Sequence, residues 1–260
     1  MPATPAAPPA HPITFDPTLI AKGPAAIKEW AGAVRSFAKQ LSPVERATFL
    51  MALDSALYEE QGYAAIAANL HGGLHPKHAL MRYHDFFVSH VAAGERVLDI
   101  GCGYGAVGHA VATRSAATVV GLDSNPANIE KARRLFPHER LTFVVGTAPA
   151  SVPPGPFDTI VLSNVLEHIE HRPDFLRAIQ AAVSPAQWLI RVPMFTRDWR
   201  PSLRHELGLY AYSDPTHFTE YTDASFRDEM AAANFEIRHL QVNWGEIWAV
   251  VGRPRSGAAR

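Results

Sequence analysis

The chain has 260 residues, of which 47% are hydrophobic and 19% charged, with a formal net charge of −1. This composition is typical of a globular protein with a sizeable core, and the near-neutral charge gives no argument for nucleic-acid binding. The one cysteine excludes an intramolecular disulfide and a cysteine-based zinc finger. We expect neither a membrane span, which needs roughly 20 apolar residues, nor a secretory signal, and therefore a cytoplasmic location.

The N-terminal part of the sequence predicts a leader followed by a helical appendage. Residues 1–15 begin with a stretch rich in proline and alanine, and we expect a disordered leader there. Residues 16–74 are predicted to be helical, because apolar residues recur every three or four positions and Ser42-Pro43-Val44-Glu45 is a helix-start signal. These helices carry no chemical motif. We consider three possibilities for them: a homodimer interface, a substrate cap, or a region without a specific role.

Strands and helices alternate over residues 75–252. Runs typical of buried strands occur at 96–100, 117–122, 141–145, 157–162 and 188–192. This alternation predicts an α/β fold with a doubly wound, mostly parallel sheet. A helix at about 222–233 and two further strands within 235–251 complete the predicted domain, and residues 253–260 form a tail.

A glycine-rich turn follows the first of these strands. The sequence Asp99-Ile100-Gly101-Cys102-Gly103-Tyr104-Gly105 ends a buried strand at an acidic residue and leads into a helix. Closely spaced glycines let the backbone turn tightly and approach a ligand, and the helix start offers unpaired N–H groups. Turns of this kind at the carboxyl ends of parallel strands bind nucleotides.

Two alignments of this motif lead to different cofactors. Gly103-x-Gly105-x-x-Gly108, with Asp123 about 20 residues further on, matches the dinucleotide fingerprint of NAD enzymes. The other alignment starts at Asp99, whose carboxylate would repel a pyrophosphate but suits a cationic, amino-acid-bearing cofactor. That pattern resembles motif I of class I S-adenosylmethionine-dependent methyltransferases, and we favour this family, with an NAD oxidoreductase as the last alternative.

The resemblance implies a seven-stranded, Rossmann-like sheet, with S-adenosylmethionine as cofactor and S-adenosylhomocysteine as product. Asp123 would bind the ribose hydroxyls, and the glycine turn would pass under the methionine part. Relatives often have an acidic residue after the third strand, where this chain has Gly146 and Thr147, so the adenine contact would come from the backbone or Thr147. The predicted cofactor-binding residues are Asp99, Gly101, Cys102, Gly103, Gly105, Asp123, Ser124, Thr147, Asn164 and Arg82.

The segment His71–His90, just upstream of the turn, is dense in histidine. One interpretation is an amphipathic helix with surface histidines. The other is a helix over the cofactor, from which Arg82 or Tyr83 reaches the cofactor carboxylate or the substrate. Metal binding by this segment is not expected, because no paired spacing such as HExxH occurs.

The fourth predicted strand is followed by Ser163-Asn164-Val165-Leu166-Glu167-His168-Ile169. This stretch resembles the signature of a methyltransferase subgroup that includes ubiquinone-type methylases, in which a Glu-His pair follows the strand. His168 is either a packing residue or a general base that takes a proton from a hydroxyl near pH 7. Glu167, His168 and His171 could be drawn as a metal site, but no second carboxylate cluster accompanies them, and we predict no metal.

A long connection follows the fifth predicted strand, and residues 193–221 are predicted to form a substrate lid, because such loops are usually functional or disordered. Its aromatic and charged content, with the later Trp244–Trp248 stretch, suits a sugar-like acceptor. These regions resemble methyltransferases associated with bacterial surface glycans. The predicted acceptor-binding residues are Arg191, Asp214, Tyr221, Trp244 and Trp248.

The sequence therefore predicts an O-methyltransferase acting on a sugar, a glycan or another polar small molecule. A hydroxyl acceptor needs a base, for which the order of preference is His217, His168 and then Glu246. An N- or C-methyltransferase, for which a base matters less, is the first alternative. A protein that binds the cofactor without turnover is the second.

Overall fold

The computed structural model describes residues 23–70 and 75–254. The chain divides into two compact units between Ser55 and Ala56, within helix α3 (Pro43–Ala67). The predicted leader, the end of the appendage at 71–74 and most of the predicted tail lie outside the described residues. The predicted boundary at residue 74 stays a prediction.

The first unit is a helical hairpin of α2 (Pro24–Ala38) and the first part of α3. Its second helix begins as the sequence predicts: the backbone N–H of Ser42 donates to the Glu45 carboxylate at 3.0 Å, and that of Glu45 donates to the Ser42 hydroxyl at 3.4 Å. The rings of Phe37 and Phe49 pack edge to face with centroids 5.3 Å apart. The capping box thus fixes where the chain reverses.

The second unit contains the predicted seven-stranded, mostly parallel sheet, and its strand order is β3-β2-β1-β4-β5-β7-β6. Its parallel part is β1 (Arg96–Ile100), β2 (Thr118–Asp123), β3 (Leu141–Val145), β4 (Thr159–Ser163) and β5 (Gln187–Pro193). The last two strands, β6 (Glu236–Asn243) and β7 (Glu246–Gly252), form a hairpin, and β7 pairs antiparallel with β5. Since β1 lies between β2 and β4, the strand order reverses there, which is the position where α/β sheets bind ligands.

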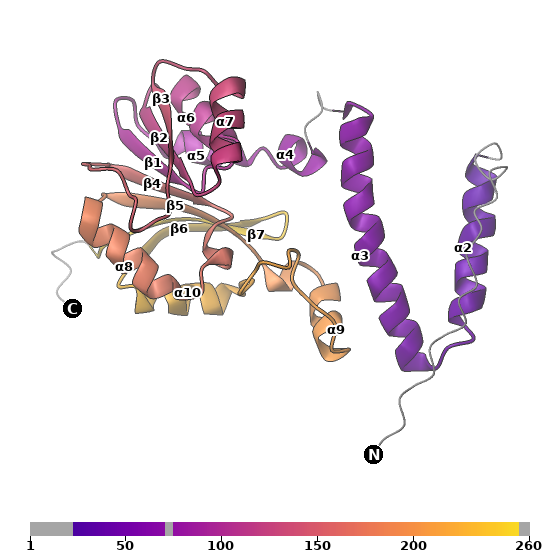
Figure 1. The fold of residues 1–260 in the computed structure, drawn as a ribbon. Coiled ribbons are helices and arrows are strands. Elements are labelled where there is room, and N and C mark those ends of the chain that lie inside the picture. Colours follow the sequence, from indigo (N-terminus) through magenta and orange to yellow (C-terminus); the bar gives the residue numbers. More distant parts are fainter. Residues whose placement is uncertain (1–22, 71–74, 255–260) are drawn as a thin grey trace. The chain divides into compact units, whose positions relative to one another are not determined.

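Helices cover both faces of this sheet (Figure 1). On one face lie α5 (Tyr83–Ser89), α6 (Ala106–Arg114) and α7 (Pro126–Leu135), and on the other α8 (Arg172–Val183) and α10 (Asp223–Ala232). A short helix, α4 (Pro76–Met81), precedes α5. Strand residues such as Leu98, Val119 and Ile160 are fully buried, which explains why the central strands are almost continuously apolar. Among the described residues, no helix is both long and apolar enough to cross a membrane.

The predicted lid contains two short helices, η3 (Phe195–Arg197) and α9 (Arg200–Glu206), and is tied at its base. The N–H of Tyr221 donates to the carbonyl of Pro193 at 3.0 Å, and that of Phe195 donates to the carbonyl of Tyr221 at 2.8 Å. The N–H of Met194 donates to the carbonyl of Gly245, in the β6–β7 turn. The two ends of the lid therefore meet beside this turn, so the regions that the sequence predicts to bind the acceptor lie together.

Candidate active site

The glycine turn has the geometry that its sequence predicts. Gly101, Gly103 and Gly105 have φ of 67°, 53° and 83°, a region that side chains disfavour. A Cβ on Gly101 would lie 2.6 Å from Val165, and one on Gly105 would lie 2.4 Å from the Phe143 ring. A Cβ on Gly103 would meet nothing within 4 Å. Two glycines therefore permit close packing of the turn, while Gly103 presents bare backbone to open space, as a cradle for a ligand requires.

Asp123, at the end of β2, lies against this turn. Its Oδ2 accepts a hydrogen bond from the N–H of Gly103 at 2.9 Å, and its Oδ1 accepts from the N–H of Asn125 at 2.9 Å and the Asn128 amide at 3.1 Å. The carboxylate thus joins the turn to the start of α7. Its place at the strand end, beside the cradle, fits the predicted ribose-binding role.

Asp99 is almost fully buried near the carboxyl end of β1. Its side chain is 1% exposed, and its carboxyl group lies near the backbone of Gly108 in α6. Burial raises the pKa of Asp99 to about 7. A group enclosed in this way packs against α6, and a direct contact of Asp99 with the cofactor stays a prediction.

The contacts of Arg82 also argue against its predicted cofactor role. Its guanidinium pairs with Asp85 at 2.7 Å, and the same carboxylate pairs with Arg114 at 2.7 Å. Arg114 is the last residue of α6, whereas the glycine turn leads into the first, about 12 Å away along the helix. Arg82 is therefore directed to the C-terminal end of α6, away from the glycine turn.

The remaining predicted cofactor residues lie on the loops that follow the strands. Ser124 and Thr147 are exposed. Cys102 is half-buried, and burial raises the pKa of its thiol far above the usual range, so it stays protonated. Asn164 has φ of 56° and a buried side-chain oxygen without a hydrogen-bond partner among the described residues. These positions are compatible with a cofactor along the carboxyl ends of β1 to β4.

Glu246, the third candidate base, is the centre of a buried ion-pair network. Its carboxylate accepts from the Arg191 guanidinium at 2.5 and 2.8 Å, from Lys77 at 2.9 Å and from the Trp248 indole at 3.1 Å. Burial favours a higher pKa for Glu246, but Lys77 and Arg191 outweigh it and hold the pKa below its ordinary value. A carboxylate that is ionised and occupied on both oxygens is a poor proton acceptor. Glu246 is therefore a structural anion and not the base.

Three of the predicted acceptor residues are buried, and two of them, Arg191 and Trp248, belong to the same network. Arg191 is 2% exposed, and its guanidinium lies over the Tyr83 ring, 3.8 Å from the centroid. Trp248 is 5% exposed and donates to Glu246. Tyr221 is 1% exposed and donates to Glu229 at 2.6 Å. Because all three are buried, they hold β5, β7 and α10 together and are not surfaces for an acceptor.

His168 and His217 come together although they are far apart in the sequence. Their ring centroids lie 4.6 Å apart, with His168 on the short helix η2 (Leu166–His168) after β4 and His217 on the lid. The N–H of Phe218 donates to the carbonyl of Glu167 at 2.8 Å, which fixes the lid to η2. Burial, and then the neighbouring His217, lower the pKa of His168, so its ring is neutral at pH 7.

Each ring has a partner that orients it. The Thr216 hydroxyl donates to Asp214 at 2.6 Å and therefore accepts from Nδ1 of His168, 2.9 Å away. His217 Nδ1 lies 3.1 Å from Oε1 of Glu220 and donates to it. In both rings, the nitrogen that remains for a ligand or a proton is Nε2.

Glu220 is a residue whose role the sequence analysis missed. It is buried, accepts from the N–H and hydroxyl of Ser213 at 2.5 and 2.6 Å, and pairs with Arg197. Burial favours a higher pKa for Glu220, but His217, Ser213 and Arg197 together lower it. Its position three residues after His217 was the available signal. Glu220 thus fixes the lid around His217.

Glu167 is a second residue that is absent from the predicted site residues. Its side chain is fully buried, and neither carboxylate oxygen has a hydrogen-bond partner among the described residues. Burial raises the pKa of Glu167 to about 8. The carboxyl group lies beside the two imidazoles, because one ligand atom from each of Glu167, His168 and His217 falls within 4.8 Å of the others. A buried acid without a partner next to two oriented histidines is the most unusual chemical feature of the described chain.

Three accessible aromatic side chains lie on the lid or in the β6–β7 turn beside its base. Trp244, Trp199 and Phe218 are 69%, 61% and 55% exposed. Of the predicted acceptor residues, Trp244 and the half-buried Asp214 therefore remain available for contact.

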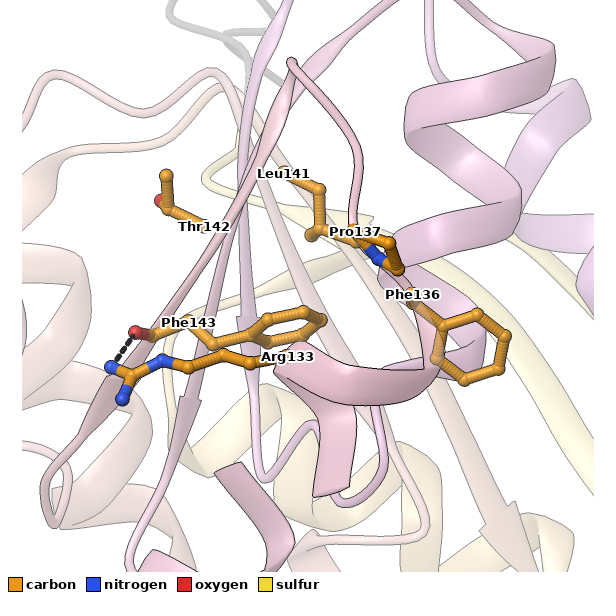
Figure 2. A pocket seen from close by; sticks show the side chains of 6 residues that line it. All are labelled: Arg133, Phe136, Pro137, Leu141, Thr142 and Phe143. Carbon is orange, nitrogen blue, oxygen red and sulfur yellow. Dashed lines mark hydrogen bonds between the residues drawn. The ribbon is translucent and has the colours of Figure 1, made fainter. Parts of the chain in front are cut away.

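The pocket shown in Figure 2 lies elsewhere, between α7 and the edge strand β3. It has a volume of about 300 Å³, and the Arg133 guanidinium crosses it to donate to the carbonyl of Phe143 at 2.7 Å. Its lining consists of Arg133, Phe136, Pro137, Leu141, Thr142 and Phe143. Since it contains neither histidine of the pair nor the turn glycines, we do not connect it with the chemistry.

Comparisons with known proteins agree with this geometry. A family described as "Methyltransferase domain" matches residues 74–240. The mitochondrial ubiquinone biosynthesis O-methyltransferase of Schizosaccharomyces pombe is 37% identical over 98 residues, which are 36% of this chain and 35% of that protein. The corresponding protein of Albidiferax ferrireducens is 28% identical over 128 residues, 46% of this chain and 50% of that protein.

A similar fold occurs in a solved TehB-like S-adenosylmethionine-dependent methyltransferase from Corynebacterium glutamicum. Its TM-score is 0.52 at 18% identity, and the match covers 78% of this chain and all of that one. The match to the curated relatives spans at most half the length of the two described above. The family match and the fold together decide between the two alignments of the glycine motif, against the NAD enzyme. The chain belongs to the methyltransferase-domain family and is of the class I, S-adenosylmethionine-dependent type.

Proposed function

We propose that the protein is an O-methyltransferase that methylates a hydroxyl of a polar small molecule, with a sugar or glycan as the preferred acceptor class. The observation that carries the proposal is the pair of histidines, whose Nε2 atoms are left available after Thr216 and Glu220 have bonded Nδ1. A neutral, oriented imidazole beside the carboxyl ends of β1 and β4 is suited to accept a hydroxyl proton.

The roles of the chain's own residues follow from this geometry. S-adenosylmethionine, when bound, supplies the methyl group as an electrophile and leaves as S-adenosylhomocysteine. Gly103 and Asp123 hold the cofactor at the turn. With the cofactor and acceptor bound, Nε2 of His217 would take the proton from the acceptor hydroxyl, with His168 as the second choice. The lid excludes water from this reaction.

The sugar-like acceptor is supported by the side chains that remain accessible on the lid side. The indoles of Trp244 and Trp199 offer planes for stacking, and Asp214 offers a hydrogen-bond acceptor. The two relatives described above are named for O-methylation in ubiquinone biosynthesis, which supports oxygen as the methylated atom. A phenolic acceptor is therefore the comparison that the experiment must include.

The test is a turnover assay that detects S-adenosylhomocysteine and identifies the methylated product by mass spectrometry. Panels of sugars, phenols and amines separate the acceptor classes. His217→Ala is expected to lower kcat at least tenfold while leaving cofactor affinity unchanged, and the exposed His171→Ala is the matched control. Methylation of amines alone would refute the proposal. Cofactor binding with no turnover on any acceptor would favour a protein that binds without catalysis.

We also propose that the N-terminal helices mediate a homodimer. Ile27, Val44 and Tyr58 are 68%, 66% and 66% exposed, which is unusual for apolar side chains. Light scattering of the full chain tests this, and replacement of Ile27, Val44 and Tyr58 by aspartate is expected to convert a dimer into a monomer. A full-length monomer at all concentrations would exclude it.

A further inference from the structure

We propose that Glu167, His168 and His217 form a binding site for a divalent transition-metal ion of the Zn²⁺ type, completed by the lid. The sequence does not predict this site, because its third ligand comes from a segment beyond β5. In the structure, one ligand atom from each of the three residues lies within 4.8 Å of the other two. Two imidazoles and one carboxylate are a known ligand set for such ions.

The spacing is close to what an ion requires. Ligand atoms about 2.1 Å from a tetrahedral ion are roughly 3.4 Å apart. The ligand atoms of Glu167, His168 and His217 are separated by no more than 4.8 Å. Side-chain movements on the order of 1 Å would therefore bring them to the ion. Nothing else in the described chain uses the Glu167 carboxylate oxygens.

The strongest independent sign of a missing ligand is Glu167 itself. A fully buried carboxyl group normally has hydrogen-bond partners or an ion, because desolvation without them is costly. Both oxygens of Glu167 lack partners among the described residues. A bound cation would satisfy both the charge and the lone pairs of this group.

The surroundings of the two histidines are those that metal ligands usually have. A ligating imidazole generally donates its second N–H to a carboxylate, a carbonyl or another oxygen, which fixes the ring and directs the other nitrogen at the ion. His217 donates to Glu220, and His168 donates to Thr216, which in turn donates to Asp214. Both rings therefore present Nε2 as the free ligand atom.

The donor set also decides which ions are preferred. Imidazole nitrogens suit Zn²⁺ and Co²⁺, whereas Mn²⁺ and Mg²⁺ prefer oxygen ligands, and Mg²⁺ keeps several waters. Three protein ligands leave a fourth position open, as in catalytic zinc sites. The ion and the proton compete for the same two Nε2 atoms. In the loaded protein, the ion would therefore lower the pKa of a hydroxyl bound at the open position, and the proton would pass to solvent.

This role in hydroxyl activation rests on the proposed function, but the binding of the ion does not. The experiment is therefore done on the full chain without methyl donor or acceptor. The protein is stripped with a chelator, dialysed and titrated with ZnCl₂ in a calorimeter, and the bound metal is counted by mass spectrometry. Mn²⁺ and Mg²⁺ are titrated separately, and the absorption spectrum of the Co²⁺-loaded protein reports the ligand geometry.

We expect one Zn²⁺ per chain, bound at least 100-fold more tightly than Mg²⁺. His217→Ala and Glu167→Gln are each expected to weaken Zn²⁺ binding at least tenfold, whereas His171→Ala, at an exposed histidine outside the cluster, leaves it unchanged. Circular dichroism verifies that each variant is folded. If Glu167→Gln does not fold, His168→Ala replaces it.

Two results would overturn the site. One is the absence of stoichiometric Zn²⁺ binding to the stripped wild-type chain, and the other is unchanged Zn²⁺ binding in both His217→Ala and Glu167→Gln, or in His168→Ala where it replaces the latter. Either result would leave the proposed O-methyltransferase with His217 as its base untouched. Conversely, stoichiometric binding that depends on the three residues establishes the site even if no hydroxyl acceptor is ever methylated.

Discussion

Glu246→Gln is the substitution that best separates a structural ion pair from a catalytic base. The carboxylate is 2% exposed and accepts from Arg191, Lys77 and Trp248. Glutamine has almost the same volume but no charge. The variant therefore leaves the Arg191 guanidinium, which is 2% exposed, without its counter-ion in the interior.

The expected cost follows from that burial. Removing one partner of a buried ion pair typically destabilises a protein by about 3–5 kcal/mol, because the other charge stays desolvated. For a domain of this size, such a loss lowers Tm by on the order of 10 °C. The cost should fall toward the lower end, because Lys77 is 35% exposed and can turn to water. The aromatic contact with Tyr83 also partly compensates Arg191.

The assay is urea unfolding followed by circular dichroism, with calorimetry for Tm. Asp223→Asn, in the exposed pair with Arg227, is the matched control and is expected to change nothing measurable. The double variant Arg191→Met/Glu246→Leu removes both charges and is expected to recover most of the lost stability. A Glu246→Gln protein with wild-type stability but greatly reduced kcat would refute our reasoning and restore Glu246 as a base.

Three further predictions concern the turn, the lid and acid stability. Gly105→Ala, which combines φ of 83° with a Cβ 2.4 Å from Phe143, is expected to cost about 1–3 kcal/mol in urea unfolding and to weaken S-adenosylhomocysteine binding at least tenfold in calorimetry. Glu220→Gln releases His217 from its orientation, and kcat is expected to fall at least tenfold with unchanged cofactor affinity; an unchanged kcat would remove Glu220 from the site. Burial lowers the pKa of His84 from 6.5 to about 4, so the unfolded chain binds a proton there between these pH values and the folded chain does not. Stability is therefore expected to be full above pH 6.5 and to fall as the pH drops toward 4, less steeply in His84→Gln; equal urea midpoints at pH 7 and pH 5 would contradict this.

The features that sequence predicted well are those encoded by neighbouring residues. The glycine turn, the end of β2 at Asp123 and the capping box at Ser42 each depend on a few consecutive positions with one backbone solution. Likewise, the mostly parallel, doubly wound sheet follows from alternating strands and helices with right-handed crossovers. In these cases the local sequence and the overall fold require the same backbone conformation.

The residues whose contacts differ most from the sequence prediction depend on partners that are distant in sequence. Glu246 lies among aromatic residues in the sequence, a setting typical of an active-site acid. Its partner Arg191 is 55 positions away, and only the pairing of β5 with β7 reveals it. Arg82 is close to the turn in sequence, yet a left-handed backbone with φ of 51° ends α4 there and directs the chain toward the far end of α6. The Glu167–His168–His217 cluster needs the path of the lid, which no periodicity encodes.

The hydrogen bonds at the base of the lid have a consequence for how this protein could diversify. Because Pro193, Phe195 and Tyr221 are bonded to one another, the segment between them begins and ends at a single point of the structure. An exchange of residues 196–220 would therefore leave the register of β5 and the position of α10 unchanged. Evolution can therefore exchange this segment as a unit. Such an exchange would change the acceptor contacts and the third ligand of the proposed metal site together, while the glycine turn and Asp123 stay the same. Chimeras of related chains joined at these two positions should accordingly fold as readily as their parents.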